Sequence, residues 1–335
     1  MKKLTALSIV FLLIFSGCSS TNHENTPIKL SNFFLNTVSS VTIYDMEKEK
    51  AEKIISASFA YCKELESIFS RTIESSEIAR INDSGGNWVN VSDDTVRLIT
   101  MAKEQSIISG GYFDCTIAPV SILWDFNSET PTIPSEEELA EALSHVNWEN
   151  IEIDSNNIRL LDEKASIDLG GIAKGFIGDM AKAFLIEQGV TRAIIDLGGN
   201  ILTINTDSTD TFNIGIQKPF SLQNESICVL TVSNLSVVTS GVYERYFEEN
   251  NTIYHHLLDV ETGMPVNNGL YSVTIIAENS AFADALSTTC FVIGLEKGLS
   301  LIESISGVEG IFIDENLEIS YTSGIGTDIG FRVAQ

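Results

Sequence analysis

The stretch from Asp168 to Gly175 constrains the fold of this chain more than any other. Before it, Ser166–Leu169 alternates polar and apolar residues and predicts the end of a strand. After it, residues 173–188 carry apolar side chains at helical spacing and are followed by Gly189, which predicts a helix that stops at a glycine. The sequence therefore predicts a strand, a glycine turn and a helix in this order.

This turn has the chemistry of an anion site. Gly170 and Gly171 let the backbone approach a ligand closely, and the free N–H groups of a helix start favour a negative charge. Lys174 adds a positive charge in the first helical turn, and Asp168 adds a carboxylate at the strand end. The combination indicates a phosphate site or a phosphate–metal site. The alternative is an ordinary strand–turn–helix joint, because glycine-rich turns are common.

The N-terminus predicts the compartment. Lys2 and Lys3 precede an apolar run over 4–15, and Ser16-Gly17-Cys18 follows. This pattern predicts a bacterial lipoprotein signal over 1–17, cleaved so that Cys18 carries lipid on the extracytoplasmic face of the cell membrane. The run is too short for a stable transmembrane helix, and an uncleaved anchor is the alternative. The polar residues that follow predict a flexible tether over 18–30, with one folded domain over 31–335.

The charge of the chain excludes some partners. The 335 residues include 46 acidic and 20 basic ones, for a net charge of −26. So acidic a surface argues against nucleic acid as a partner and against a chain that lies flat on anionic lipid. A phosphate ligand would need a metal cation beside it. The four cysteines beyond Cys18 form no C-x-x-C motif and sit among apolar residues, which predicts core positions: Cys62, Cys115, Cys228 and Cys290.

Helical and strand patterns alternate along the chain. Helices are predicted over 47–69, 92–109, 281–292 and 295–304, and another begins at Ser135 with Glu138 in the capping-box position. Strands are predicted over 35–44, 193–197 and 270–277, with a hairpin over 151–161. This order predicts an α/β or α+β fold with mixed sheets flanked by helices.

A second group of polar residues lies late in the chain. Asp284 and Thr288 are four residues apart on a predicted helix, so both side chains share one face. A carboxylate and a hydroxyl suit a hard cation such as Mg²⁺, although a solvated helix face is the alternative. His255 and His256 follow a predicted strand, whose alternation would point at most one of them toward a given site.

These motifs together resemble the FAD:protein FMN transferase (ApbE) family of bacterial flavin transferases. The resemblance runs from about Leu35 to Phe331 and depends on the order of the motifs. They are Ser76-Glu77-Ile78 with Asn82, Phe113-Asp114-x-Thr116, Asp168-Leu-Gly-Gly-Ile-Ala-Lys-Gly, Asp196-Leu-Gly-Gly-Asn, Thr239-Ser240-Gly241 with Tyr243-Glu244-Arg245-Tyr246, His256 with Asp259 and Thr262-Gly263-x-Pro265, and Ala283-Asp284-Ala285-Leu286-Ser287-Thr288.

The resemblance implies two intertwined α/β subdomains with FAD in the cleft between them. It implies that Mg²⁺ is held by the side chains of Asp284 and Thr288 and by the backbone carbonyl of Gly171. It also implies a set of FAD contacts: Leu35, Thr72, Tyr112, Phe113, Asp114, Asp168, Lys174 and Leu258. Thr72 stands where many members carry an aromatic residue, so ring stacking is not expected at that position.

The implied reaction moves FMN from FAD to a threonine hydroxyl of an acceptor protein and releases AMP. Lys174 would stabilise the charge on the phosphates, and His256 is the candidate base because its reference pKa lies near neutrality. Asp114 or Asp168 could serve instead. The family suggests an extracytoplasmic electron-transfer subunit as the acceptor. Two alternatives are an FAD pyrophosphatase that gives FMN and AMP, and a non-catalytic flavin-binding lipoprotein.

Overall fold

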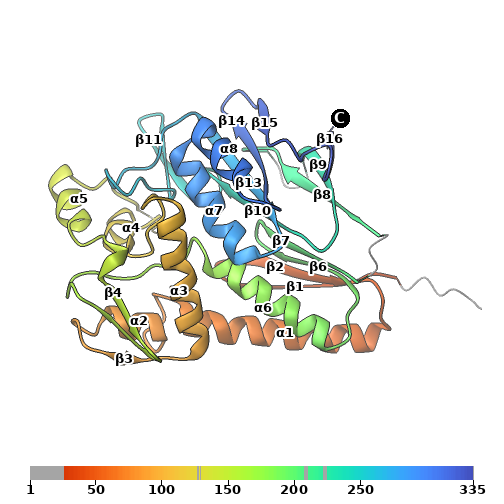
Figure 1. The fold of residues 1–335 in the computed structure, drawn as a ribbon, viewed down its shortest axis with the longest axis horizontal. Coiled ribbons are helices and arrows are strands. Elements are labelled where there is room, and N and C mark those ends of the chain that lie inside the picture. The colour runs from red at the N-terminus through yellow and green to blue at the C-terminus, as the bar shows by residue number, and fades with distance from the viewer. Residues whose placement is uncertain (1–25, 127, 129, 207–209, 222–224, 335) are drawn as a thin grey trace, which may run out of the picture.

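An eight-stranded sheet runs through the computed structural model, which describes residues 26–334 except 127, 129, 207–209 and 222–224 (Figure 1). Every ladder between its strands is antiparallel. In spatial order the strands are β1 (Ile28–Phe34), β2 (Thr37–Ile43), β6 (Arg192–Leu197), β7 (Asn200–Asn205), β10 (Ser236–Gly241), β13 (Leu270–Ala277), β14 (Glu309–Asp314) and β15 (Ile319–Tyr321).

Each face of this sheet is covered by a different layer. On one face, buried side chains of β10 and β13 pack with those of helix α7, and β6 and β7 pack with α1 and α6. On the other face, Val237, Ile276 and Ile311 pack against a three-stranded sheet. The covering elements are α1 (Lys48–Phe69), α6 (Ala173–Glu187), α7 (Ser280–Ile293) and α8 (Leu295–Glu303), and opposite them β8 (Phe212–Gln217), β9 (Ser226–Val232) and β16 (Gly330–Val333).

A smaller unit is inserted between α1 and α6. Its short strands form the order β3-β5-β4, and its helices lie beside the large helices of the main unit (Figure 1). Its elements are α2 (Glu77–Asn82), β3 (Val89–Asn90), α3 (Asp93–Ile108), α4 (Ala118–Trp124), α5 (Glu136–Leu143), a 3₁₀ turn (Trp148–Asn150), β4 (Ile151–Asp154) and β5 (Asn157–Leu160).

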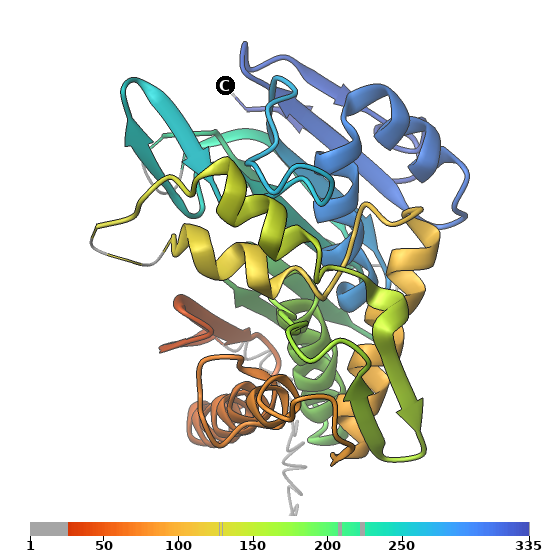
Figure 2. The ribbon, with the colours of Figure 1, turned by 90° about the vertical axis from the view of Figure 1, so that its left-hand side faces the viewer.

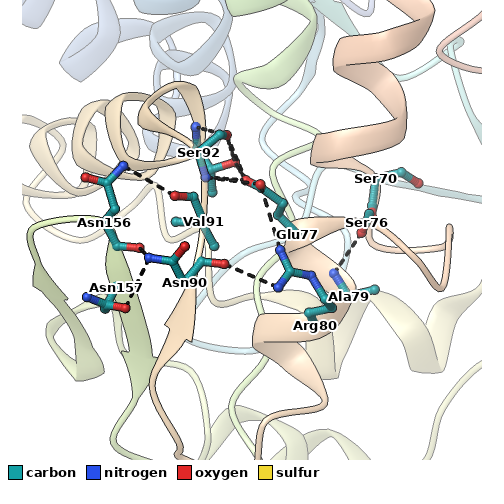
Figure 3. A network of polar contacts seen from close by, with 11 residues as sticks. Ser70, Ser76, Glu77, Ala79, Arg80, Asn90, Val91, Ser92, Asn156 and Asn157 are labelled. Carbon is teal, nitrogen blue, oxygen red and sulfur yellow. Dashed lines mark hydrogen bonds and ion pairs between the residues drawn. The ribbon is translucent and has the colours of Figure 1, made fainter.

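Polar contacts fix the start of α3 in this unit (Figure 3). The carboxylate of Glu77 accepts hydrogen bonds from the backbone N–H of Ser92 at 3.0 Å and from its hydroxyl at 2.8 Å. The Ser92 hydroxyl accepts from the N–H of Thr95 at 3.3 Å, as an N-cap does. Helices α2 and α3 are thereby held together ahead of the loop that carries Tyr112 to Asp114.

A separate hairpin packs against the inserted unit. It consists of β11 (Tyr246–Glu249) and β12 (Thr252–His255), and Figure 2 shows it in teal beside the yellow helices α4 and α5. Phe247 and Tyr254 pack their rings on Trp124, with centroids 6.3 and 5.6 Å away. The Trp124 indole N–H donates to the carbonyl of Gly263 at 2.8 Å. The two units are therefore joined by an aromatic cluster near the end of α4.

Most predicted elements are confirmed. The helices predicted over 47–69, 92–109, 173–188, 281–292 and 295–304 match α1, α3, α6, α7 and α8 to within one or two residues. The capping box of Ser135 and Glu138 is present at the start of α5, and Gly189 follows α6 with a φ of 81°. The α/β (α+β) class is confirmed. The sheets are antiparallel rather than mixed, because the chain returns through hairpins and through helices that reverse its direction.

Three local predictions are wrong. Ser166–Leu169 is not a strand but an extended segment with one bridge from Ser166 to Ile117. The strand predicted over 35–44 begins later, because Leu35 and Asn36 form the left-handed turn, with φ values of 54° and 55°, that joins β1 to β2. Strand β1 starts at Ile28, so the last three residues of the predicted tether, 28–30, belong to the sheet.

The predictions for the signal, for Cys18 and for most of the tether fall outside the described residues. In the part of the chain that the structure describes, no helix is both long and apolar enough to cross a membrane. The four cysteines in that part are buried as free thiols, in agreement with the predicted core positions.

Candidate active site

A cleft that is partly open to solvent lies where the inserted unit meets the main unit, and the space in it, open solvent included, is about 1250 Å³. Its walls carry most of the residues that the sequence singled out: Tyr112, Phe113, Asp114, Asp168, Gly171, Lys174, His256, Leu258, Asp284 and Thr288. Leu35 and Thr72 line an adjoining cavity that shares Arg71, Asp168 and Lys174 with the cleft. The structure thus brings the predicted residues together from both ends of the chain.

The glycine turn before α6 is held by its own carboxylate. Asp168 accepts hydrogen bonds from the N–H of Gly170 at 2.8 Å, from Nε of Arg71 at 2.9 Å and from the hydroxyl of Ser121 at 3.1 Å. A Cβ on Gly171 would lie 3.1 Å from the ring of Phe113, which is tighter than ordinary van der Waals contact. A larger residue at Gly171 would therefore displace Phe113 from the cleft wall.

Helix α6 begins at the cleft without a side-chain cap from its own sequence. Ile172 occupies the cap position, and the N–H of Gly175 donates instead to Oδ2 of Asp284 at 2.9 Å. The positive end of the helix dipole and the Lys174 ammonium both lie at this end of α6. The predicted anion-binding character of the turn thus has a geometric basis.

Asp284 lies at the floor of the cleft and is only 2% exposed. Its Oδ1 is 3.4 Å from the Lys174 ammonium, so the buried carboxylate has a partial counter-charge. One helical turn away, the Thr288 hydroxyl is 3.4 Å from the hydroxyl of Ser240 and 3.6 Å from the position of a Cβ on Gly171. Thr288 therefore lies close to Gly171, one helical turn from Asp284.

This donor set fits Mg²⁺. The described residues contain no group of three or more His, Cys, Asp or Glu side chains that could hold a metal ion. Mg²⁺ is commonly bound by one or two carboxylates together with waters and the phosphates of a substrate. Asp284 with neutral oxygens from Thr288 and Gly171 belongs to that pattern, in which the substrate supplies the remaining ligands.

Helices α6 and α7 cap each other. While Asp284 of α7 accepts from the start of α6, Asp179 of α6 accepts from the N–H groups of Ser280 and Ala281 at 2.9 Å each. Burial raises the pKa of Asp179 to about 6, with a smaller contribution from the Asp284 charge, and Lys182 and the two N–H donors oppose the shift. The two carboxylates fix the crossing that presents Asp284 to the cleft.

One of the two histidines faces the cleft. His256 lines it, and its Nδ1 is 3.3 Å from the carbonyl of Arg245. His255 is buried, with Nε2 2.9 Å from the carbonyl of Val266 and its ring against Phe291. This confirms that at most one histidine points to the site.

The expected near-neutral pKa of His256 is wrong. Burial, followed by the charges of Arg245, His255 and Lys174, lowers this pKa to about 3. His256 is therefore a neutral imidazole throughout the physiological pH range.

Asp114 lines the cleft, but its oxygens are already in use. Oδ1 accepts from the N–H of Thr116 at 2.8 Å and from its hydroxyl at 2.6 Å, and Oδ2 accepts from the N–H of Trp148 at 2.9 Å. Burial raises the pKa of this carboxyl, against the effect of these hydrogen bonds. The geometry favours a role for Asp114 in shaping the loop beneath the cleft.

Several cleft residues were missed from the sequence. Arg71 and Ser121 contact Asp168 from positions 97 and 47 residues away, and neither carries a local signal. Glu244 and Arg245 were visible as part of a motif but had no assigned role, although both line the cleft. Burial raises the pKa of Glu244, and the charges of Lys174 and Arg245 oppose this.

The fold and the cleft together define an α+β protein in which a helix start, a lysine and a buried carboxylate meet at one cleft. The sequence model of the ApbE family matches residues 35–312. A protein of Klebsiella pneumoniae (strain 342) named FAD:protein FMN transferase is 33% identical over 275 residues, which are 81% of this chain and 85% of that protein. A protein of the same name from Treponema pallidum (strain Nichols) is 31% identical over 284 residues, 80% of this chain and 78% of that protein. This chain belongs to the ApbE family.

Solved structures agree with this assignment. The crystal structure of the ApbE protein of Thermotoga maritima superposes with a TM-score of 0.82 at 31% identity, and covers 89% of this chain and 97% of that one. The flavin transferase ApbE from Vibrio cholerae has the same fold, with a TM-score of 0.78 over 89% of this chain and 97% of that one, at 23% identity.

Proposed function

We propose that this protein is an FAD:protein FMN transferase. It takes FAD as the donor and another protein as the acceptor, and it moves FMN to a threonine hydroxyl of that acceptor. The observation that carries the proposal is the meeting of Lys174, Asp284, Thr288 and Gly171 at one end of α6, inside a cleft that opens to solvent. Membership of the family and the names of relatives that span most of this chain support it.

In this reaction the threonine oxygen forms a bond to the phosphorus of the FMN half of FAD. The bond between that phosphorus and the bridging oxygen breaks, AMP leaves with the bridging oxygen, and the threonine proton passes to a base. Negative charge accumulates on the phosphates, and such transfers depend mainly on positioning and electrostatic stabilisation. The Lys174 ammonium and the N-terminal end of α6 supply positive potential at this place.

We propose that Asp284, Thr288 and the carbonyl of Gly171 hold Mg²⁺. When bound, the ion would neutralise charge on the diphosphate, which suits a chain with a net charge of −26. Without the metal, the Lys174 ammonium helps to balance the negative charge of Asp284. With the metal bound, it would help to balance the charge of the phosphates. Asp179 helps to hold Asp284 in position, because its hydrogen bonds to the start of α7 fix the crossing of α6 and α7.

The FAD contacts divide between two cavities. Four of these residues line the main cleft and not the adjoining cavity: Tyr112, Phe113, Asp114 and Leu258. Leu35 and Thr72 line the adjoining cavity. Asp168, held by Arg71, lies between them and near Lys174. This arrangement supports an extended FAD with its diphosphate near the start of α6.

His256 remains our proposed base, with Asp168 as the alternative. A neutral imidazole on the cleft wall can accept a proton at any pH above about 3, although so low a pKa makes it a weak base. Asp168 already accepts from Arg71, Ser121 and its own loop, which reduces its availability.

We further propose that Cys18 is lipidated and holds the enzyme on the extracytoplasmic face of the cell membrane, next to an acceptor in an electron-transfer subunit. The support is the order of two lysines, a short apolar run and Ser16-Gly17-Cys18. The described structure begins shortly after this segment.

The decisive experiment mixes the purified protein with FAD, Mg²⁺ and an extracytoplasmic electron-transfer domain that contains a flavinylation threonine. A transferase makes the acceptor band fluorescent in a denaturing gel and releases one AMP per label. A pyrophosphatase releases AMP and FMN without labelling the acceptor. A flavin-binding lipoprotein binds FAD and releases neither product, so either of the last two results would overturn the proposal.

A further inference from the structure

Three cavities meet at one pair of cations. Lys174 and Arg245 line the main cleft, the cavity that contains Thr72, and a third groove. The transfer of FMN also brings three groups together at one phosphorus atom: the departing AMP, the flavin-bearing chain and the attacking threonine. The site therefore has three branches, one for each of these three groups.

The first two branches have the walls that rings require. The main cleft carries Tyr112, Phe113 and Leu258. The second branch has an apolar wall made of Leu35, Phe69, Leu169 and Ile177. Flat, largely apolar ring systems are bound by such walls, so these branches suit the two ring systems of FAD.

The third branch is different in character. One wall is the turn between β1 and β2, with Asn36 and Thr37, and the other is the segment of Glu244 and Tyr246 that leads into β11. In Figure 2 this turn (red) and the hairpin β11–β12 (teal) lie on the same side of the molecule. Polar groups from both walls can bind the N–H and C=O groups of a polypeptide, which repeat along its length.

We propose that this third branch is the acceptor groove, in which an extended segment of the acceptor protein lies with its threonine hydroxyl at Lys174 and Arg245. The inference rests on the proposed function and adds the route by which the second substrate arrives. The groove shares Phe126, Gly198 and Glu244 with the main cleft, so a chain within it reaches the phosphate end of the site.

The wall at β11 is built to receive a strand. Among the described strands, β11 pairs only with β12, so no described strand occupies its second edge, where an added chain could pair. Tyr246 opens this strand and is 43% exposed. Its ring is supported edge-on by Phe220 at 5.6 Å, and Phe220 adopts a left-handed backbone with φ 57° to reach it. A supported, exposed tyrosine is a typical contact residue of protein interfaces.

The chemical step fits this placement. The acceptor threonine loses its proton to the base, its oxygen binds the phosphorus of the FMN half, and AMP departs through the main cleft. Entry from a separate branch lets FAD occupy its two cavities before the acceptor arrives. The attacking oxygen can then approach from a side that neither ring system fills.

The test measures acceptor KM and FAD affinity separately, with the acceptor domain of the labelling assay as the probe. In Tyr246→Ala we expect acceptor KM to rise about tenfold, the scale of a lost aromatic contact at an interface. We expect FAD affinity to stay within twofold, and Tyr246→Phe to restore most of the acceptor KM. Tyr321→Ala is the matched control, because Tyr321 is 46% exposed, packs at a tilt against the ring of Phe331 and lies outside the three cavities.

A second variant tests the opposite wall without removing any aromatic support. In Thr37→Cys, a bulky maleimide on the new thiol should block acceptor labelling and leave FAD binding intact, because Thr37 lines the third branch and neither of the two FAD cavities. The parent protein treated in the same way controls for Cys18, and the other four thiols are buried.

Three outcomes are distinct from one another. An unchanged acceptor KM in Tyr246→Ala, together with unhindered labelling in the blocked Thr37→Cys protein, overturns the acceptor groove. A loss of FAD affinity in both proteins assigns the groove to the flavin and also overturns it. Failure of the parent to label the acceptor at all overturns the proposed function instead.

Discussion

At the scale of single residues, one carboxylate has two separate structural tasks. Oδ2 of Asp284 satisfies the N–H of Gly175, and Oδ1 faces the Lys174 ammonium and the open cleft. Burying a charge at 2% exposure is costly unless it is paired and hydrogen-bonded, and both conditions are met here. The pairing is loose at 3.4 Å, so a cation beside Oδ1 would be accommodated by a small movement of Lys174.

The first prediction separates these two tasks with Asp284→Asn. The amide oxygen can still accept from Gly175, so the melting temperature should change little. The charge that attracts Mg²⁺ is lost, and turnover at sub-millimolar Mg²⁺ should fall by about 100-fold or more. Thr288→Val, which removes a neutral ligand, should have a smaller effect. Normal turnover and normal Mg²⁺ affinity in Asp284→Asn would refute the metal assignment.

The second prediction concerns the pH dependence of His256. Its pKa is lowered to about 3, so its basic form is present above that value and does not change between pH 5 and 8. We therefore expect His256→Asn to reduce transfer by about 10²- to 10⁴-fold at every pH in this range. The shapes of the two pH–rate profiles should coincide. A rising limb near pH 6 to 7 that is present in the parent and absent from the variant would contradict the lowered pKa.

At the scale of elements, the crossing of α6 and α7 is the feature on which the site depends. The two helices approach so closely that a Cβ on Gly175 would lie 2.2 Å from the carbonyl oxygen of Ser280. Each helix supplies the carboxylate that caps the other. The position and orientation of Asp284 are therefore set by the contacts between two helices, α6 and α7.

The third prediction follows from the raised pKa of Asp179, about 6 against an ordinary 3.8. Between these values the folded protein retains a proton that the unfolded chain has lost, so raising the pH destabilises the fold. This group should lower the free energy of unfolding by up to about 3 kcal/mol as pH rises from about 4 to 6, with no further loss above that range. Asp179→Asn should flatten this part of the stability curve.

Chemical unfolding at several pH values measures this effect. Asp328→Asn is the control, since it removes one acidic charge from an exposed position. Other buried carboxyls with raised pKa values, at Asp114, Asp196 and Glu244, are present in both proteins and cancel in the comparison. Equal slopes in parent and Asp179→Asn would remove Asp179 as the source of the dependence.

Local patterns predicted the helices well and the turns poorly. Helix α6 was readable because its apolar residues recur at helical spacing and Gly189 ends it. The segment before it was misread, because alternation over Ser166–Leu169 arises from contacts of individual side chains and not from a ladder. The turn at Leu35 and Asn36 gave no signal, since a leucine with φ 54° is not expected in a left-handed conformation.

At the scale of the whole molecule, the cleft is a product of long-range contacts. Arg71 meets Asp168 across 97 residues, and Lys174 meets Asp284 across 110. The residue types at Asp168, Lys174 and Asp284 pointed to phosphate and cation chemistry, and the resemblance connected them. The position of Arg71 and the existence of a third groove could not be predicted, because they depend on how the inserted unit and the hairpin β11–β12 dock on the main unit.

The last prediction concerns how this molecule is held beside its acceptor. Strand β1 begins at Ile28, so about ten residues separate Cys18 from the folded unit, and an extended chain of that length reaches about 30 Å. A lipid on Cys18 would therefore keep the cleft close to the membrane surface, and membrane-bound acceptors within reach. The parent should fractionate with membranes and incorporate labelled palmitate, whereas Cys18→Ser should stay uncleaved or become soluble, with Ser19→Ala as the control. If the parent lacks its signal and remains in the membrane without any lipid, the protein is anchored by other means and the predicted reach no longer applies.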